Sequence, residues 1–430
     1  MTGFGERTLD VAYANGWDGP RGVLLGPLSE RAAAGRDAAG EPYAVVIKDG
    51  GPSGEEVGAS GCLAGVVVLH VDGGRGYVGL WLYDAQGRRV GQADLRRIEE
   101  RRLFLRERRT WRYGSAETAE FAADAGRVTL RWYPDGQRSE CVEPEGDRGG
   151  SRRSFGSVDV GQQWLPAPEF GQWDRLLPAL GLESEGGVRL RTSGDALPGV
   201  PVDLDGTANW RAPEPMRPRL LDEQFTPGTR IAAHGEVYVT LAPHPAGQVH
   251  LPSGRLVTRD PTYAACAQDS GFTVTVAPGS YPVEIAFAAY ETERSGRALA
   301  IDEITAARVR ISDRPTVRWE SALLEGQDPR LLGDGEFYGF GVDGGLGSFV
   351  DATAAGALGE CFFDEMGAGR VREDGEGVMT LDDPESGANL IAFPSGRGDG
   401  SYPVWIGRDG DGHVTCFVAD LCVLHRGQLS

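Results

Sequence analysis

Seven residues in the last hundred positions have side chains of types that could form a chemical site. They are Asp343, Asp351, Asp399 and Asp420, together with Ser395, Tyr402 and Trp405. Carboxylates from separate loops can bind a hard cation jointly or act as an acid and base pair. The structural interpretation is that Asp beside Gly hydrogen-bonds to the backbone of its own turn. We favour that interpretation, assign no catalytic residue, and keep Asp343, Asp351, Ser395, Asp399, Tyr402 and Trp405 as binding candidates.

The serines and histidines do not form a recognisable catalytic or zinc motif. Ser253 and Ser395 both lie in Pro-Ser-Gly triplets, which lack the frame of a GxSxG nucleophile elbow. His234, His244 and His250 lie close together, but zinc sites have tighter ligand spacing, such as HExxH or paired cysteines. Turn chemistry for the serines and scattered surface or core positions for the histidines are the better interpretations.

Two short aspartate and glycine segments, 203–206 and 409–412, resemble the opening of a calcium loop. Neither keeps the full spacing of that loop, which ends in a glutamate at its twelfth position. The second segment lies where a hairpin turn is expected. No glycine-rich phosphate loop is followed by Lys and Ser or Thr. The sequence therefore predicts no metal and no cofactor.

The elements that must position these residues are mainly strands. Segments 65–71 and 76–84 are separated by Asp-Gly-Gly, and segments 127–133 and 137–142 by Pro-Asp-Gly, so both pairs are expected to form hairpins. Short strands are also expected at 236–241, 272–276, 283–287, 307–311 and 414–418. Residues 352–358 are expected to form a short helix with Asp351 at its start. Residues 364–388, which are acidic and rich in glycine, are expected to form an exposed loop.

Composition and these elements predict a mainly β protein, α+β at most. The 430 residues are enough for two or three domains, and the 64 glycines suit a fold with many tight turns. Five prolines between 198 and 218 resist both helix and central strand. We expect two β-rich domains of short antiparallel strands with few short helices, at 1–205 and 221–430, joined by a proline-rich linker at 206–220.

The charge of the chain limits its partners. A net charge of −20 disfavours nucleic acid and anionic lipid. Residues 95–113 contain eight arginines, which could bind an anion, but interleaved glutamates favour a solvated face. The N-terminus lacks the layout of a signal peptide, and no apolar run approaches the roughly 20 residues of a membrane helix. We expect a cytoplasmic protein whose six widely spaced cysteines are free thiols.

Five segments of the C-terminal half resemble, in order, motifs of the domain-of-unknown-function 4241 family. They are LPSGRLVTRDP (251–261), PGSYPV (278–283), RISDRPTVRWE (310–320), FGVDGGLGSFVD (340–351) and SGRGDGSYPVW (395–405). The resemblance covers about residues 220–425 and implies a fold and a set of characteristic residues, without an activity. At position 397, where the family often has an aromatic residue, this chain has Arg397.

Two functional hypotheses remain open, so the sequence leaves undecided whether the protein is an enzyme. In the first, the protein is a non-catalytic module that binds a protein partner or a small-molecule ligand on its C-terminal domain. A role in bacterial conflict or immunity would be consistent with this but rests on association alone. In the second, it is a hydrolase that uses Asp343, Asp351 and Asp399, with or without a divalent cation. That hypothesis requires the three carboxylates within about 5–10 Å of one another in one cleft.

Overall fold

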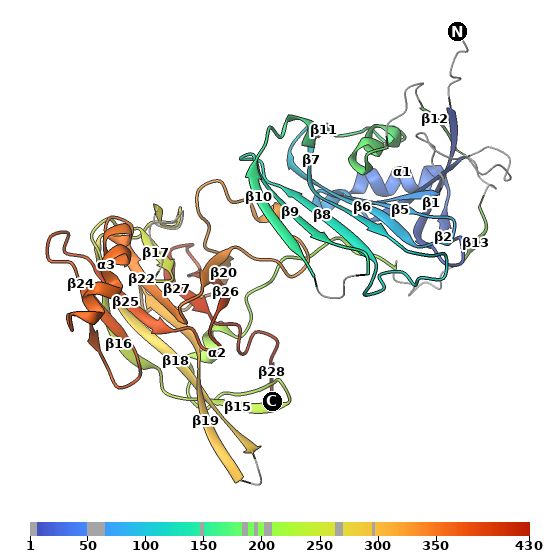
Figure 1. Ribbon diagram of the computed structural model, residues 1–430. Helices are drawn as coiled ribbons and strands as arrows, with labels where there is room; N and C mark the ends of the chain where they lie inside the picture. Colours follow the sequence, from blue (N-terminus) through green and yellow to red (C-terminus); the bar gives the residue numbers. More distant parts are fainter. Residues whose placement is uncertain are drawn as a thin grey trace. The chain divides into compact units, whose positions relative to one another are not determined.

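A computed structural model describes residues 7–49, 65–146, 150–182, 188–192, 197–201, 209–262, 270–294 and 297–430. The chain divides into two compact units, residues 1–213 and 214–430. Each is a β structure, which confirms the predicted mainly β fold (Figure 1). Cys62, Cys266 and the aspartates of segment 203–206 lie outside the described residues. The other four cysteines are free thiols.

The first unit is one large sheet with helices on one face. Its helices are α1 (Glu30–Ala39) and the 3-10 helices η1 (Gly73–Arg75), η2 (Gly161–Gln163) and η3 (Trp173–Leu180). Its strands are β1 (Arg7–Asp18), β2 (Val23–Leu28), β3 (Tyr43–Asp49), β4 (Val66–Asp72), β5 (Tyr77–Tyr83), β6 (Arg89–Glu99), β7 (Arg102–Arg112), β8 (Gly126–Trp132), β9 (Gln137–Glu143), β10 (Arg152–Ser157), β11 (Trp164–Pro166), β12 (Val188–Thr192) and β13 (Gly199–Val200). Within the described residues the main path of the sheet runs β10-β9-β8-β7-β6-β5-β4-β3-β1-β2-β13. The hairpins expected at 65–84 and 127–142 are confirmed as β4–β5 and β8–β9.

Strand β3 is buried on both faces of this sheet. Tyr43 faces α1 and η3, which lie on the same side of the sheet in Figure 1, and its hydroxyl donates to Asp37 of α1 at 2.8 Å. Ala44 and Val46 face the other side and pack in a cluster with Trp17. Neighbouring side chains of a strand point to opposite faces. Because both faces of β3 are buried, nearly all of its consecutive residues are apolar.

The second unit is a sandwich of two sheets with a helix outside each. Its helices are α2 (Leu221–Gln224), the 3-10 helix η5 (Pro329–Leu331) and α3 (Ala355–Gly367). Its strands are β14 (Arg230–Ala233), β15 (Glu236–Thr240), β16 (His244–Leu251), β17 (Leu256–Arg259), β18 (Gly279–Arg294), β19 (Arg297–Arg310), β20 (Arg318–Ser321), β21 (Gly339–Val342), β22 (Leu346–Asp351), β23 (Arg372–Glu373), β24 (Met379–Asp382), β25 (Asn389–Pro394), β26 (Gly400–Arg408), β27 (Val414–Asp420) and β28 (Gln428–Leu429). The described residues form a ten-stranded sheet, β20-β26-β27-β19-β18-β15-β14-β28 with β16 and β21 beside it, and a five-stranded sheet, β17-β22-β25-β24-β23.

The main core lies between these two sheets. It joins Val283 and Phe417 of the larger sheet to Phe349 and Phe393 of the smaller one. A second cluster packs α3 on the outer face of the smaller sheet through Leu358 and other residues. A third packs α2 on the outer face of the larger sheet. No helix in the described part of the chain is long and apolar enough to cross a membrane.

Some boundaries in this unit differ from the prediction. The helix expected at 352–358 starts at 355 and runs to 367, because Asp351 to Ala354 form a turn before it. The segment 364–388, expected as a loop, contains the end of α3 and the hairpin β23–β24. The strand expected at 272–276 was wrong: Phe272 and Thr273 bond to two different segments, at Leu256 and Leu323, so no ladder forms. The two central strands, β18 and β19, are 16 and 14 residues long rather than short.

Candidate functional site

The tertiary structure brings together two of the turns that the sequence singled out. Val342 pairs with Gly400 between β21 and β26, so Asp343 and Asp399 lie just beyond the same end of this ladder. The amide of Ser395 donates to the carbonyl of Gly345 at 3.0 Å, which fixes the turn at 343–345 beside the loop at 395–399. The carboxylates of Asp343 and Asp399 are both exposed. These two acids are neighbours on the surface.

Asp260, which the sequence did not single out, orders the first of these turns. Its carboxylate accepts hydrogen bonds from the amides of Asp343 and Gly344 at 2.9 and 2.8 Å, and from the amide and hydroxyl of Thr262. Its side chain is buried, with 2% exposed. The only signal for this role in the sequence was its place in the Asp-Pro pair of the family motif.

Asp351 lies at the opposite end of β22 and does not join Asp343 and Asp399. The five residue steps from Leu346 to Asp351 span roughly 16 Å at about 3.3 Å per residue. Its buried carboxylate accepts four hydrogen bonds, two from Ser253 and two from the amide and hydroxyl of Thr353. Asp420 is also buried, and it accepts a bond from the amide of Cys422. These two acids fix turns of the backbone.

Ser395, Tyr402 and Trp405 are buried and occupied by internal contacts. The hydroxyls of Ser395 and Tyr402 both donate to the carbonyl of Gly398, at 2.8 and 2.7 Å, and so brace the 395–399 loop. Trp405 points to the other face of β26, where it packs with Leu221 of α2. None of the three presents its side chain to a ligand at the surface.

Arg397 is held against the sheet. Its guanidinium donates to Glu303 at 2.8 Å and to the hydroxyl of Tyr238 at 3.2 Å, and lies 3.3 Å from the Nε2 atom of His234. The hydrogen bond with Glu303 raises the pKa of Arg397. The side chain that stands where the family often has an aromatic ring is therefore an anchor of this loop.

A groove in the described part of the second unit lies at the open edge of the sandwich. It has a volume of about 430 Å³. Its walls are the β16 segment 245–250, the hairpin β23–β24 and the start of β25. Val378 and Ile391 supply apolar surface at its base, and both belong to the main core. A cavity of this size is within the range of small-molecule sites.

Charged side chains line this groove, called the charged groove from here on, and Arg372, Asp374 and Asp382 are among them. The Nε2 atom of His244 lies 2.7 Å from the carboxylate of Asp374, and Arg372 forms an ion pair with Asp382. Burial raises the pKa of Asp374, but the hydrogen bonds from His244 and from two backbone amides outweigh it, so the pKa lies below its usual value. The hydrogen bond from Arg372 likewise lowers the pKa of Asp382. Both carboxylates are therefore ionised acceptors at neutral pH.

The side-chain amide of Asn389 spans the groove and bonds to the backbone of β16, as a neighbouring strand would. The side chain of Asn389 accepts from the amide of His250 at 2.7 Å and donates to the carbonyl of Gln248 at 2.9 Å. Asn389 is 3% exposed. It thereby bonds the outer edge of β16 to the smaller sheet and fixes the width of the groove at this point. Periodicity of the sequence carries no signal for such a side chain.

The three histidines expected to be scattered are separated in the structure. His234 lies against the carbonyl of Val423, His244 beside Asp374, and His250 beside the hydroxyl of Ser280. In the described residues, the group with metal-ligand geometry is Asp409, Asp411 and His413, in the turn between β26 and β27. There the guanidinium of Arg314 bonds to both aspartates, at 2.8 and 3.1 Å, and supplies the positive charge that a cation would bring.

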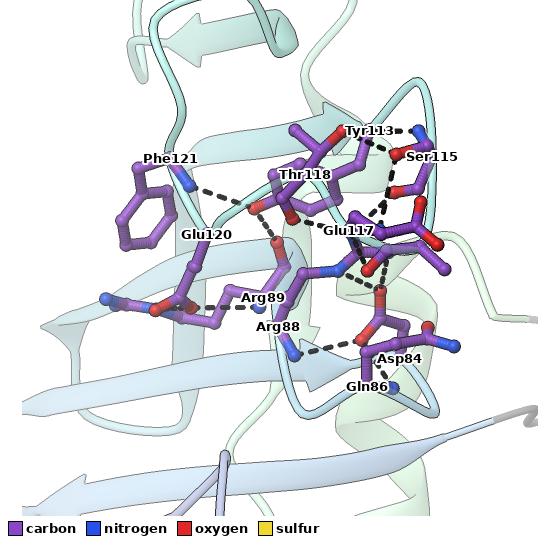
Figure 2. Close-up of polar contacts among 11 residues, drawn as sticks. Asp84, Gln86, Arg88, Arg89, Tyr113, Ser115, Glu117, Thr118, Glu120 and Phe121 are labelled. Carbon is purple, nitrogen blue, oxygen red and sulfur yellow. Dashed lines mark hydrogen bonds and ion pairs between the residues drawn. The ribbon is translucent and has the colours of Figure 1, made fainter.

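The arginines of the first unit are largely used in internal pairs. On the β6–β7 hairpin, Arg96 and Arg106 bond to buried Asp94, and Arg109 bonds to buried Glu107. Figure 2 shows the neighbouring network, in which the guanidinium of Arg88 donates to three carbonyls of the loop at 115–118. These interactions close a loop and balance charge, as expected of interleaved charges.

Part of the second unit matches a sequence-family model. Residues 249–419 match the model of the family described as "Protein of unknown function (DUF4241)". This confirms the predicted resemblance and locates it within the second unit. The matched residues include His250, Arg372, Asp374, Asp382 and Asn389 of the groove. Neither the curated proteins nor the solved structures give a match to the chain.

Proposed function

We propose that the protein is a non-catalytic binding module whose second unit holds a small polar ligand in the charged groove. The observation that carries this proposal is that one concavity of about 430 Å³ is lined both by the ion pair Arg372–Asp382 and by the carboxylate of Asp374, which His244 holds by a hydrogen bond. Binding sites combine apolar surface with a few fixed polar groups. Val378 and Ile391 supply the apolar surface here.

The groove suits a ligand that carries both a hydrogen-bond donor and an acceptor. Arg372 provides donors, whereas Asp374 and Asp382 provide ionised acceptors. A zwitterion such as an amino acid or a short peptide terminus satisfies both kinds of group. It would bind by exchanging one internal ion pair for two pairs with the ligand, which keeps every charge satisfied.

Catalysis has less support than binding. A general acid needs a carboxyl group with a raised pKa, whereas the pKa values of Asp374 and Asp382 are lowered. The hydrolase hypothesis required Asp343, Asp351 and Asp399 in one cleft. The four internal hydrogen bonds of Asp351 and its place at the far end of β22 favour a structural role for it instead.

A thermal-shift screen of the full chain tests the proposal. The panel contains free amino acids, dipeptides, monosaccharides and nucleosides. A ligand that binds only the folded state raises Tm through mass action, by about 2.7 kcal/mol of stability at 100 times its Kd. We expect amino acids or dipeptides to raise Tm, and the nucleosides and sugars to leave it unchanged.

Two variants make the screen specific for the groove. Arg372→Ala removes the groove guanidinium, and Arg330→Ala removes a similarly exposed arginine that pairs with Asp328 elsewhere in the unit. The ligand-induced shift should disappear in the first variant and persist in the second. A shift of equal size in both variants, or no shift from any class of compound, would overturn the proposal.

A further inference from the structure

Strand β10 is an edge strand of the large sheet of the first unit. In the described part of the chain it pairs with one neighbour, β9. All six of its residues pair with β9 in a single register without a bulge, and all six are exposed. The other strands at the ends of the sheet paths are shorter. They are β13, β28 and β23 with two residues each, and β20 and β17 with four. Among the strands at the ends of these paths in the described residues, β10 is thus the longest.

The backbone pattern of β10 identifies which of its polar groups face the open side. The amide of Val158 donates to the carbonyl of Gly136 at 2.8 Å, next to the pair Ser157–Gln137. In an antiparallel ladder the amide and carbonyl of every second residue point to the same neighbour. Even-numbered residues therefore bond to β9, and Arg153, Phe155 and Ser157 direct theirs outward. These three residues form a template for one more strand.

The side chains of β10 add an apolar contact and positive charge to this template. Phe155, at the centre of the edge, is 81% exposed. The side chains of Arg152 and Arg153 form no hydrogen bond or ion pair with other described residues. The acids of the adjacent strand are already occupied, because Glu140 pairs with Arg138 and Glu143 pairs with Arg127. A local positive charge therefore remains at this edge of a chain whose net charge is −20.

Natural proteins usually protect an open edge with a bulge, a proline, a short strand or charged side chains. β10 has no bulge and no proline, and an exposed aromatic ring stands at its centre. Its two arginines would discourage a basic or apolar strand and attract an acidic one. The edge can therefore accept a further strand, and its charge favours an acidic strand over a basic or apolar one.

We propose that this β10 edge is a docking surface for an extended, acidic segment of a partner protein, which adds to the sheet as a further strand. The backbone of the segment bonds to Arg153, Phe155 and Ser157. Its acidic side chains meet Arg152 on one face and Arg153 on the other, and an apolar side chain packs on Phe155. A second copy of the chain fits less well, because β10 offers no acid to an opposing β10 and each copy carries a net charge of −20. This surface is independent of the charged groove of the second unit.

Fluorescence anisotropy with the full chain tests the proposal. The probe is a fluorescein-labelled peptide of alternating Glu and Val, and the control peptide has Lys in place of Glu. We expect the acidic peptide to bind, with an affinity that falls as salt is added, and the basic peptide not to bind. Equal binding of the two peptides, or no binding of the acidic one, would contradict the proposal.

Variants separate the contributions of the backbone and of charge to binding of the acidic peptide. Ser157→Pro removes one outward amide without touching the ladder with β9, and Ser157→Ala keeps that amide as its control. Arg153→Glu reverses one edge charge, and Arg31→Glu reverses an exposed charge on α1 as its control. Ser157→Pro and Arg153→Glu should bind the acidic peptide at least about tenfold more weakly, with the controls unchanged. Unchanged affinity in Ser157→Pro, with a folded circular dichroism spectrum, overturns the proposal. So does a dimer, seen by light scattering, that Ser157→Pro dissociates, because a second copy then occupies the edge.

Discussion

The imidazole of His70 lies edge-on against the indole of Trp81, with 4.0 Å between the ring centroids, and Trp210 lies on it at 4.5 Å. The ring is fully buried, and neither nitrogen has a hydrogen-bond partner among the described residues. Burial, with a smaller contribution from the charge of Arg89, lowers the pKa of His70 to about 3. The native state of the first unit therefore holds a neutral imidazole well below neutral pH.

Because His70 is buried in its neutral form, we predict that the free energy of unfolding of the first unit falls in acid. The pKa of an unfolded histidine is about 6.5, so stability is complete above that pH. As the pH falls from 6.5 toward 3, the unfolded chain binds a proton that the native state does not, and stability falls by about 1.4 kcal/mol per pH unit. Between pH 6.5 and 4.5, His70→Phe should gain roughly 3 kcal/mol relative to the wild type. Urea unfolding followed by tryptophan fluorescence measures this, and parallel pH profiles of the two proteins would contradict it.

Removal of the carboxylate should destabilise the protein strongly at Asp351 and hardly at all at Asp399. Asp351→Ala leaves two amides and two hydroxyls without their acceptor, so we expect a loss of about 3–5 kcal/mol. Asp399→Ala, at an exposed carboxylate, should change stability by less than about 0.5 kcal/mol. Thermal and urea unfolding of the two variants provide the comparison. A mild Asp351→Ala variant would show that this carboxylate does not hold the turn.

Gly359 should resist replacement by alanine, although it lies inside a helix. Alanine at an exposed helix position gains about 1 kcal/mol over glycine. At position 359 the added Cβ would lie 2.8–3.0 Å from the guanidinium of Arg259, which is buried. We expect Gly359→Ala to destabilise the second unit by about 1–3 kcal/mol. Gly367→Ala, at the end of the same helix with no atom near the added Cβ, should be neutral or stabilising in the same melting experiment.

The cysteines should differ in their reactivity toward iodoacetamide. Burial, with the nearby charge of Asp420, raises the pKa of Cys422 to about 12, and burial also raises the pKa of Cys416. Only the thiolate reacts quickly, so both should be modified slowly at pH 8. Cys141, half-buried on β9, should be modified before them. Peptide mapping by mass spectrometry gives the order, and early modification of Cys422 would contradict the assignment.

Local patterns were enough to predict several elements. The hairpins β4–β5 and β8–β9 follow from glycine turns between alternating or apolar runs, because both signals act over a few residues. The length of α3 was not accessible in this way. Its last turns carry Phe363 and Asp364, whose helical conformation depends on packing of the preceding turns against Val350 and Leu390. The hairpin β23–β24 was missed for a similar reason, since β24 is held in its sheet by pairing with β25.

The sequence by itself determined a mainly β chain and the family resemblance of its second half, because turn residues, strand periodicity and ordered motifs are properties of short segments. Only the tertiary structure decided which of the aspartates are neighbours. It joined Asp343 to Asp399 and placed Asp351 at the other end of β22, and it brought His244 to Asp374 across 130 residues. The physical reason is that strand register is set by pairing between distant segments, so the place of a side chain in a site depends on residues that its own neighbourhood in the sequence does not contain.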